Sequence, residues 1–353
     1  MTLTSSRGPL SLLALALGAL RATKHITPAA LAHWSTWPEV RGAAAARASL
    51  STIIRGTAAG PIKKGQPDVN AIKRALAGEV LAVLDSDLHV RNPKTLQLAH
   101  RLAAIDMADR DAFDAYVALL EAANAAALQL ARSSLTPNVV MHLSCEPRVQ
   151  RAQESCKSFA AAAPLGLSQV IVVGSSAAHL FDFDVHTRVL TVPAPDSYEH
   201  LPAKVVAAMA FFALCGTQCV VKVDDDHRLS NPQLLQDYLA RVRVAHPVQM
   251  GQRNNIGILG NHVRVWHFGK CADAVRSSQP FTLPGASRWI NGAAGYLLNH
   301  QAIRLLFWSH VYFPEYIRIG LYEDMTVSDL IERQGGRLVQ ADMHSALGVV
   351  DQY

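Results

Sequence analysis

The spacing of apolar residues divides the chain into two parts. In residues 1–132, Ala-rich segments repeat apolar side chains at helical intervals, and the clearest repeat runs from Asp111 to Arg132. One face of that segment carries Phe113, Tyr116, Val117, Leu120 and Leu128. A stripe of this kind is typical of a helix that packs on its neighbours. Residues 1–132 are therefore predicted to form a mainly helical N-terminal region.

A different pattern begins after the turn-prone stretch SSLTPN at 133–138. Short apolar runs now alternate with helical segments such as Leu201 to Leu214. The runs are Val139 to Leu143, Gln169 to Val173, Val189 to Val192 and Cys219 to Val223. This alternation is typical of βαβ units, so residues 138–353 are predicted to form an α/β domain with a mostly parallel sheet. Ligands of such sheets bind beyond the carboxyl ends of the strands.

Composition adds a preference for anionic ligands. Half of the 353 residues are hydrophobic and 17% are charged, as in an ordinary folded protein. The net charge of +5 favours partners such as nucleotide-sugars, nucleic acid or acidic membranes. No Lys/Arg run of the nucleic-acid-binding type occurs, so no nucleic-acid partner is expected. The five cysteines show no paired CxxC spacing and are expected to be buried free thiols.

The apolar stretch from Leu10 to Leu20 follows Arg7 and is too short to span a bilayer, which needs about 20 apolar residues. It favours a buried or interfacial helix, with a signal peptide as the alternative. No transmembrane segment is expected. The preferred location is cytoplasmic, with peripheral membrane contact allowed, and the secretory pathway or Golgi is the alternative.

Three adjacent carboxylates follow the predicted strand from Cys219 to Val223. They are Asp224, Asp225 and Asp226. Such a cluster is costly without a cation, and Mg²⁺ and Mn²⁺ prefer oxygen ligands and bridge protein carboxylates to phosphates. Because alternate side chains of an extended chain share a face, Asp224 and Asp226 can point to one side and Asp225 to the other. A solvated acidic loop is the competing interpretation, and the position at a strand end favours a metal–diphosphate site.

Several motifs in this part of the chain occur together in one order. They are Asp196-Ser197-Tyr198, VKVDDDHRL at 221–229, the glycine-containing turn WINGAAGY at 289–296, and YEDMTV at 322–327. With them, residues 138–350 resemble the β-1,3-galactosyltransferase and Fringe-like glycosyltransferases. The resemblance implies a GT-A type fold, a nucleoside-diphosphate sugar donor, usually UDP-linked, and dependence on Mn²⁺ or Mg²⁺. It also implies transfer to a hydroxyl of a glycan or glycoconjugate acceptor with inversion at the anomeric carbon.

The resemblance carries roles to individual residues. It implies that Asp224 and Asp226 engage the metal and that Asp225 lies near the ribose. In the pair Glu323 and Asp324, it implies that Asp324 is the general base, with Glu323 as the rival candidate. Two carboxylates at the start of a helix, stabilised by its dipole, are the competing structural interpretation.

Four cationic or imidazole side chains are weaker candidates. His344 lies where related enzymes often place a metal-binding histidine, and a neutral imidazole suits Mn²⁺. Arg148 and Arg151 follow the first strand of the α/β part, at the edge of the expected nucleotide pocket. Lys270 could meet a phosphate. An ordinary surface or core residue is the alternative for His344, and ordinary helix-surface arginines are the alternative for Arg148 and Arg151.

The glycine-containing turn supplies candidates for contact with the sugar and acceptor. Trp289, or Trp266 further upstream, could stack on a sugar ring, although core packing of both is the favoured alternative. Asn291 and Gly292 lie within the turn and are predicted to face the sugar or acceptor. Related sequences are usually richer in glycine at this turn.

A segment near residues 80–97 resembles the acidic strand end. An apolar run from Val80 to Leu84 leads to Asp85-Ser86-Asp87, and Asn92-Pro93 follows at the spacing of Asn231-Pro232 after Asp226. This predicts either a partial internal repeat with a strand at 80–84 or a chance similarity. No counterpart of Glu323 and Asp324 follows, so a second active site is not expected.

The leading hypothesis is therefore an enzyme, a galactosyltransferase-like hexosyltransferase acting in carbohydrate biosynthesis. A metal-dependent nucleotidyltransferase or phosphotransferase is an alternative because acidic strand ends also position Mg²⁺ for phosphoryl chemistry. That class often uses a P-loop, and no GxxxxGK[ST] sequence occurs. A non-catalytic carbohydrate-binding protein on the same fold is the third possibility.

Overall fold

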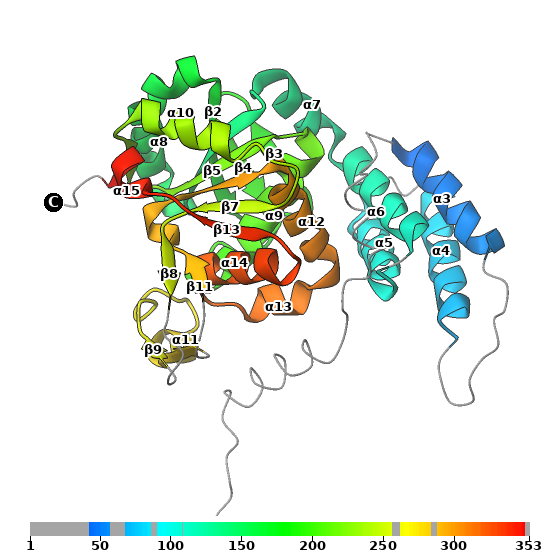
Figure 1. Ribbon diagram of the computed structural model, residues 1–353. Coiled ribbons are helices and arrows are strands. Elements are labelled where there is room, and N and C mark those ends of the chain that lie inside the picture. Colours follow the sequence, from blue (N-terminus) through cyan, green and yellow to red (C-terminus); the bar gives the residue numbers. More distant parts are fainter. Residues whose placement is uncertain are drawn as a thin grey trace, which may run out of the picture.

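The computed structural model describes residues 42–56, 68–85, 90–107, 109–255, 262–283 and 288–349. The chain is an α/β protein with an eight-stranded mixed sheet, helices on both of its faces and a group of N-terminal helices beside it (Figure 1). The apolar stretch from Leu10 to Leu20 and the residues Ser86 and Asp87 lie outside the described residues. No helix in the described part is long and apolar enough to cross a membrane.

The N-terminal region is helical, as its apolar spacing predicts. Its described helices are α3 (Gly42–Gly56), α4 (Val69–Asp85), α5 (Pro93–Ile105), α6 (Arg110–Ala123) and α7 (Ala125–Ser134). Each of the first four turns an apolar face inward, where Leu50, Val80, Leu102 and Phe113 are buried. Helices α3 to α6 lie beside the sheet domain in blue to cyan (Figure 1).

The N-terminal helices pack on the sheet domain through helix α12 (His300–Tyr312). The ring of Phe113 stacks on Tyr312 at 5.9 Å and lies 6.3 Å from Phe307. His100 of α5 meets the backbone carbonyl of His310 at 3.4 Å through Nε2. Burial of these rings joins the two groups of helices into one hydrophobic core.

The prediction of one helix from Asp111 to Arg132 is wrong, because Asn124 interrupts it. Helix α6 ends there and α7 starts at the next residue. The Asn124 amide donates to the Leu120 carbonyl at 2.7 Å, and its side-chain oxygen accepts from the Phe181 N–H at 2.8 Å. Asn competes well for backbone partners, so a buried Asn can end a helix without loss of its apolar spacing.

The predicted strand at 80–84 is also wrong. These residues form the last turns of helix α4, with Val80 fully buried among the other helices. The two segments do share one feature, which is an Asn-Pro pair that opens a helix. Asn92 caps α5 by accepting from the Lys94 N–H at 2.9 Å, and Asn231 caps α10 (Pro232–Arg241) by accepting from the Leu234 N–H at 3.0 Å. Asn before Pro is a common opening of a helix, so the shared spacing reflects capping.

The central sheet has the order β13-β7-β12-β5-β1-β2-β4-β3. Strands β5, β1, β2 and β4 are parallel neighbours, and β13 is parallel to β7, whereas β12 and β3 run antiparallel to their neighbours. The strands are β1 (Asn138–Leu143), β2 (Leu167–Gly174), β3 (Asp182–Asp184), β4 (Val189–Val192), β5 (Cys219–Asp224), β7 (Val248–Gly251), β12 (Tyr296–Asn299) and β13 (Arg337–Gln340). The four predicted apolar runs are confirmed as β1, β2, β4 and β5.

Alternation along β1 explains how helices cover both faces of the sheet. Val139 and Met141 belong to a large core with helices α9 (Leu201–Cys215), α12 and α14 (Glu323–Arg333), whereas Val140 belongs to a second core with α10. Helix α9 is apolar on all sides because it lies between the sheet and other helices. The remaining α-helices are α8 (Val149–Ser158), α11 (Ala274–Ser278), α13 (Pro314–Ile319) and α15 (Met343–Ala346).

Three short two-stranded pairs complete the domain. They are β6 (His227–Leu229) with β14 (Leu347–Val349), β8 (Arg253–Asn255) with β11 (Arg288–Ile290), and β9 (His262–Arg264) with β10 (Phe281–Leu283). The first pair returns the C-terminal part of the chain to the acidic turn after β5. The other two lie at one margin of the domain, where β8, β9 and α11 are labelled in Figure 1.

Candidate metal and sugar-transfer site

The acidic triplet lies at the carboxyl end of β5, as predicted for a ligand-binding strand end. Asp224 is the last residue of the strand, and the chain then turns into β6. Because β1 and β2 are parallel to β5, their carboxyl ends meet at the same edge. Ser144, which follows β1, and Gly174, the last residue of β2, also lie at this edge.

Each of the three carboxylates has a different set of partners. Asp224 accepts from the Lys222 ammonium at 2.7 Å, and Asp225 accepts from the Ser144 hydroxyl at 3.0 Å. Asp226 accepts from the Arg151 guanidinium at 2.7 Å. Lys222 and Arg151 therefore offset the repulsion within the triplet, and a divalent cation would have to compete with them.

Burial and hydrogen bonding separate the neighbouring carboxyl groups. Burial raises the pKa of Asp225, against the opposing effects of Ser144 and Arg151. The pKa of Asp226 is lowered, chiefly by the neighbouring His227 ring. Asp226 is therefore the better anion, and Asp225 is the more deeply buried of the two, with only 6% of its surface exposed.

The ligand set suitable for a metal consists of Asp224, Asp226 and His227. One carboxylate oxygen of each aspartate and one ring nitrogen of the histidine lie within 4.8 Å of one another. His227 is fully buried; its Nδ1 accepts from the Asp224 N–H at 3.2 Å and lies 3.4 Å from Asp226 Oδ1. Two oxygens and an imidazole nitrogen suit Mn²⁺, and the two carboxylates alone also suit Mg²⁺.

His344 occupies a different position from the one predicted. It is exposed on the short helix α15, and among the described residues it is not in a metal-binding group with the triplet. The C-terminal segment itself does return to the acidic turn, because Val349 pairs with His227 in the β14–β6 ladder. Among the described residues, His227 and not His344 is therefore the histidine grouped with Asp224 and Asp226.

The two arginine candidates differ in their contacts. Arg151 of α8 meets Asp226 and also lies 3.6 Å from Asp225, so it belongs to the acidic turn. Arg148 is exposed, and its charge acts on Asp225 from nearby. Both therefore lie beside the acidic edge, and Arg148 remains accessible to an anionic ligand.

The Glu323–Asp324 pair begins helix α14 on the other side of the same edge. Glu323 is buried, accepts from the Tyr296 hydroxyl and lies 3.4 Å from the Lys222 ammonium. Burial, partly opposed by Lys222, raises its pKa to about 6. Asp324 is half-buried and accepts from the Gly292 N–H at 3.0 Å; burial raises its pKa, and this hydrogen bond opposes the shift.

The glycine-containing turn lies directly against this acidic pair. A Cβ at Gly292 would meet Asp324 Cβ at 2.9 Å and Glu323 Oε2 at 3.2 Å, so the close approach requires glycine. Asn291 caps the turn by accepting from the Ala293 N–H at 3.1 Å. Trp289 is 3% exposed and packs against Phe281 and Met325, which corresponds to the core alternative. Trp289 is therefore not available to stack on a sugar.

Lys222 joins the two halves of the site. Its side chain is 2% exposed, and its ammonium donates to Asp224 and, at 3.2 Å, to the Gly292 carbonyl, with Glu323 also in reach. Burial opposes its charge, but Asp224 and Glu323 outweigh that effect and raise the pKa of Lys222. One buried cation therefore fixes the acidic turn relative to the acidic pair.

Lys270 reaches the site from a separate loop. Its ammonium lies 5.5 Å from the centre of the Tyr198 ring. Burial raises the pKa of Tyr198, and the nearby groups Tyr322, Asp324 and Asp224 raise it further. Lys270 is exposed and therefore accessible to a phosphate at that position.

A buried polar network supports the acidic turn from behind. Lys204 of α9 is 1% exposed and donates to the Asp196 carboxylate and, at 2.8 Å, to the Ser144 carbonyl. Asp196 also accepts from the N–H groups of Glu146 and Gly174. Because Ser144 in turn donates to Asp225, the network positions the loop after β1 against the triplet.

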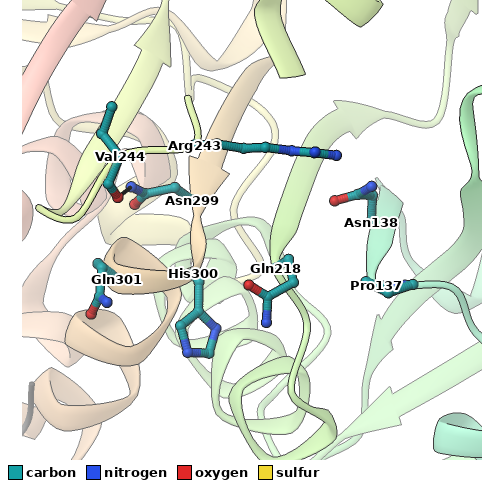
Figure 2. Close-up of a pocket in the computed structure, with 8 residues that line it drawn as sticks. All are labelled: Pro137, Asn138, Gln218, Arg243, Val244, Asn299, His300 and Gln301. Carbon is teal, nitrogen blue, oxygen red and sulfur yellow. Dashed lines mark hydrogen bonds between the residues drawn. The ribbon is translucent and has the colours of Figure 1, made fainter. Parts of the chain in front are cut away.

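A separate depression of about 480 Å³ lies at the opposite end of the sheet (Figure 2). Asn138 at the start of β1, Arg243, and His300 and Gln301 at the start of α12 contribute to its lining. His300 donates through Nδ1 to the Thr217 carbonyl at 2.8 Å. None of its lining residues belongs to the acidic edge, so it is a different site from the one described above.

Sequence reasoning assigned no role to His227, Lys222 or Tyr198, although each lies within a quoted motif. A lysine inside an apolar strand was the available signal for Lys222, because a buried ammonium requires anionic partners. No protein-family model matches the chain, and no curated protein matches it. The site geometry is therefore the basis for inferring its function.

Proposed function

We propose that this chain is an inverting, metal-dependent glycosyltransferase of the GT-A type. In this proposal a nucleoside-diphosphate sugar, with UDP as the nucleotide, donates its sugar to a hydroxyl of a glycan or glycoconjugate. The observation that carries the proposal is the position of Lys222, whose single ammonium contacts both the acidic turn and the acidic pair. The candidate metal-binding turn and the start of the helix that carries the candidate base are thus joined through one side chain.

The donor set supports a divalent cation at the acidic turn. Asp224, Asp226 and His227 would hold it, and the ion would supply charge neutralisation for a departing diphosphate. Arg148 and Lys270 are exposed cations that can bind phosphate oxygens.

Asp324 is the better of the two candidate bases. It is half-buried and accessible, whereas Glu323 is buried and bonded to Tyr296 and Lys222. A base must lie within about 2.6–3.2 Å of the proton that it removes. Asp324 therefore takes the proton of the acceptor hydroxyl as that oxygen attacks the anomeric carbon, and direct displacement inverts the sugar.

The first experiment measures release of nucleoside diphosphate from a panel of nucleotide-sugars with Mn²⁺ or with EDTA. We expect turnover with at least one donor, and loss of turnover with EDTA and in Asp226→Asn. The control Asp237→Asn changes an exposed carboxylate on α10 and should retain activity. Nucleoside triphosphates are tested in parallel, since pyrophosphate release from them would instead identify a nucleotidyltransferase.

The second experiment titrates UDP by calorimetry with and without Mn²⁺. We expect Mn²⁺ to strengthen binding and Asp226→Asn to remove the effect. Equal affinity in both conditions, or absence of turnover with every donor, would contradict the proposal. A product that retains the donor's anomeric configuration by NMR would contradict the inverting mechanism alone.

A further inference from the structure

Four exposed apolar side chains lie within one short segment beside the site. Val265, Trp266, Phe268 and Val275 are 47%, 48%, 42% and 58% exposed. They surround the turn between β9 and helix α11, and are called the 265–275 patch here. The segment lies at the margin of the domain, below β8 and β11 in Figure 1. Large apolar side chains clustered in this way are unusual unless they contact a partner or a membrane.

The exposure of the patch is imposed by the fold. His267, between Trp266 and Phe268, is fully buried and contacts the Tyr322 hydroxyl at 2.6 Å and the Gln279 carbonyl at 2.8 Å. The positive φ of Gly269, +71°, lets the chain reverse just after Phe268. With His267 held inward, the two aromatic neighbours on either side are held outward.

A second anchor fixes the far side of the segment. The buried Glu199 carboxylate accepts from the N–H groups of Ala272 and Asp273 at 3.1 Å each. Folding the patch inward would break these bonds together with those of His267. These hydrogen bonds therefore hold the apolar side chains at the surface.

The same segment carries three cations. The Arg264 guanidinium lies 5.1 Å from the centre of the Trp266 ring, Lys270 follows two residues after Phe268, and Arg276 follows Val275. Asp273 is the single carboxylate of the described segment 262–283, and it caps α11 by accepting from the Arg276 N–H at 2.9 Å. The segment thus combines aromatic and aliphatic side chains with a net positive charge.

We propose that the 265–275 patch docks the protein on the surface of an anionic lipid bilayer. Trp and Phe at the boundary between headgroups and acyl chains, with Lys and Arg toward anionic headgroups, are the combination that interfacial binding requires. Trp266 also meets the Tyr322 ring edge at 5.5 Å, and Tyr322 precedes the Glu323–Asp324 pair. Docking therefore brings the acidic edge close to the membrane surface, whatever reaction occurs there.

Vesicle flotation of the full chain tests this inference without metal, nucleotide or sugar. We expect binding to vesicles of phosphatidylcholine mixed with phosphatidylserine, and little binding to phosphatidylcholine alone. Raising the salt concentration should weaken binding by about fivefold for each cation that it screens. The double variant Trp266→Ser/Phe268→Ser should lose on the order of tenfold or more in affinity.

A matched control removes two equally exposed apolar side chains elsewhere. Ile54→Ser/Ile72→Ser changes residues that are 37% and 42% exposed on the N-terminal helices, and should bind vesicles like the unmodified chain. Vesicles should also shift the tryptophan emission of the unmodified chain to shorter wavelength, and Trp266→Phe should remove the part due to Trp266 while binding continues.

Several outcomes would overturn the inference. One is equal binding by the Trp266→Ser/Phe268→Ser variant and the unmodified chain. Another is equal binding to vesicles with and without phosphatidylserine. A third is concentration-dependent dimerisation that the double variant abolishes, with no vesicle binding, which would identify the patch as a contact between copies. Failure of sugar transfer would leave each of these results unchanged, so the two proposals fail separately.

Discussion

Replacement of Lys222 by methionine is the sharpest test of how the two halves of the site are joined. Methionine has similar length and is apolar, so Lys222→Met leaves little cavity and removes only the charge and its hydrogen bonds. The ammonium contacts Asp224 at 2.7 Å and Glu323 at 3.4 Å. Glu323 is 5% exposed at its side chain, whereas Asp224 is 37% exposed, so the lost pairing matters mainly for Glu323.

The magnitude depends on the ionisation of Glu323. Its pKa is about 6 in the folded chain against a usual value of 4.5, and burial is the main cause. The folded state therefore holds this proton more tightly, so stability falls as pH rises from about 4.5 to 6, by roughly 2 kcal/mol. Lys222 lowers that pKa, so its removal raises it further and extends the loss of stability through neutral pH.

Removing one member of a buried ion pair typically costs about 3–5 kcal/mol. We expect the low end, about 3 kcal/mol, for Lys222→Met at pH 8, where Glu323 of the unmodified chain is ionised. At pH 5 Glu323 is mostly protonated in both proteins, and only the partly exposed Asp224 loses its partner. The difference there should be about 1 kcal/mol or less.

Urea denaturation at pH 5, 6, 7 and 8 measures the free energy of unfolding of both proteins. Lys157→Met is the control, since Lys157 is exposed on α8 and pairs with the exposed Glu154. That variant should differ from the unmodified chain by less than about 0.5 kcal/mol at every pH. A Lys222→Met difference that is independent of pH, or absent, would refute the role given to the Lys222–Glu323 pair.

Further substitutions separate the proposed roles. Asp324→Asn should keep donor affinity and lose about 10²–10⁴-fold in kcat, whereas turnover within a few fold of the unmodified chain would exclude it as the base. Gly292→Ala should lower kcat by displacing Asp324, and Ala293→Ser, at the exposed neighbouring position, should not. His227→Gln should weaken Mn²⁺ binding, measured by calorimetry, about tenfold or more, and an unchanged affinity would exclude His227 as a ligand. Asn231→Ala should cost about 1 kcal/mol of stability through loss of the α10 cap, measured by urea denaturation.

The elements that the sequence predicted well are those that local pattern determines. The apolar run at Val189–Val192 is strand β4, and the run from Cys219 is β5 extended by one residue. Strand β5 is buried in a mostly parallel sheet, where continuous apolar runs are expected, whereas β4 alternates between buried and partly buried residues. The acidic residues that follow β5 lie at a strand end because the chain must leave the core there.

The errors occurred where local pattern leaves more than one outcome. The apolar run from Val80 fits a strand or the buried end of a helix, and periodicity over so few residues does not separate them. The helix break at Asn124 depends on the Phe181 N–H, which lies far along the chain. No local pattern contains that hydrogen bond, so tertiary contacts decided both outcomes.

The candidate histidine ligand also differs between the sequence and the structure: the sequence suggested His344, and the structure groups His227 with the acidic triplet. The resemblance implied a metal-binding role for His344. The C-terminal segment does return to the acidic turn, where Val349 of β14 pairs with His227. His344, however, is on α15 and exposed, whereas His227 begins β6 directly after the triplet. The turn between β5 and β6 brings the His227 ring close to Asp224 and Asp226, so a neighbour in sequence is the candidate nitrogen ligand. This chain therefore gathers its candidate ligands within four consecutive residues, and their geometry depends on one turn.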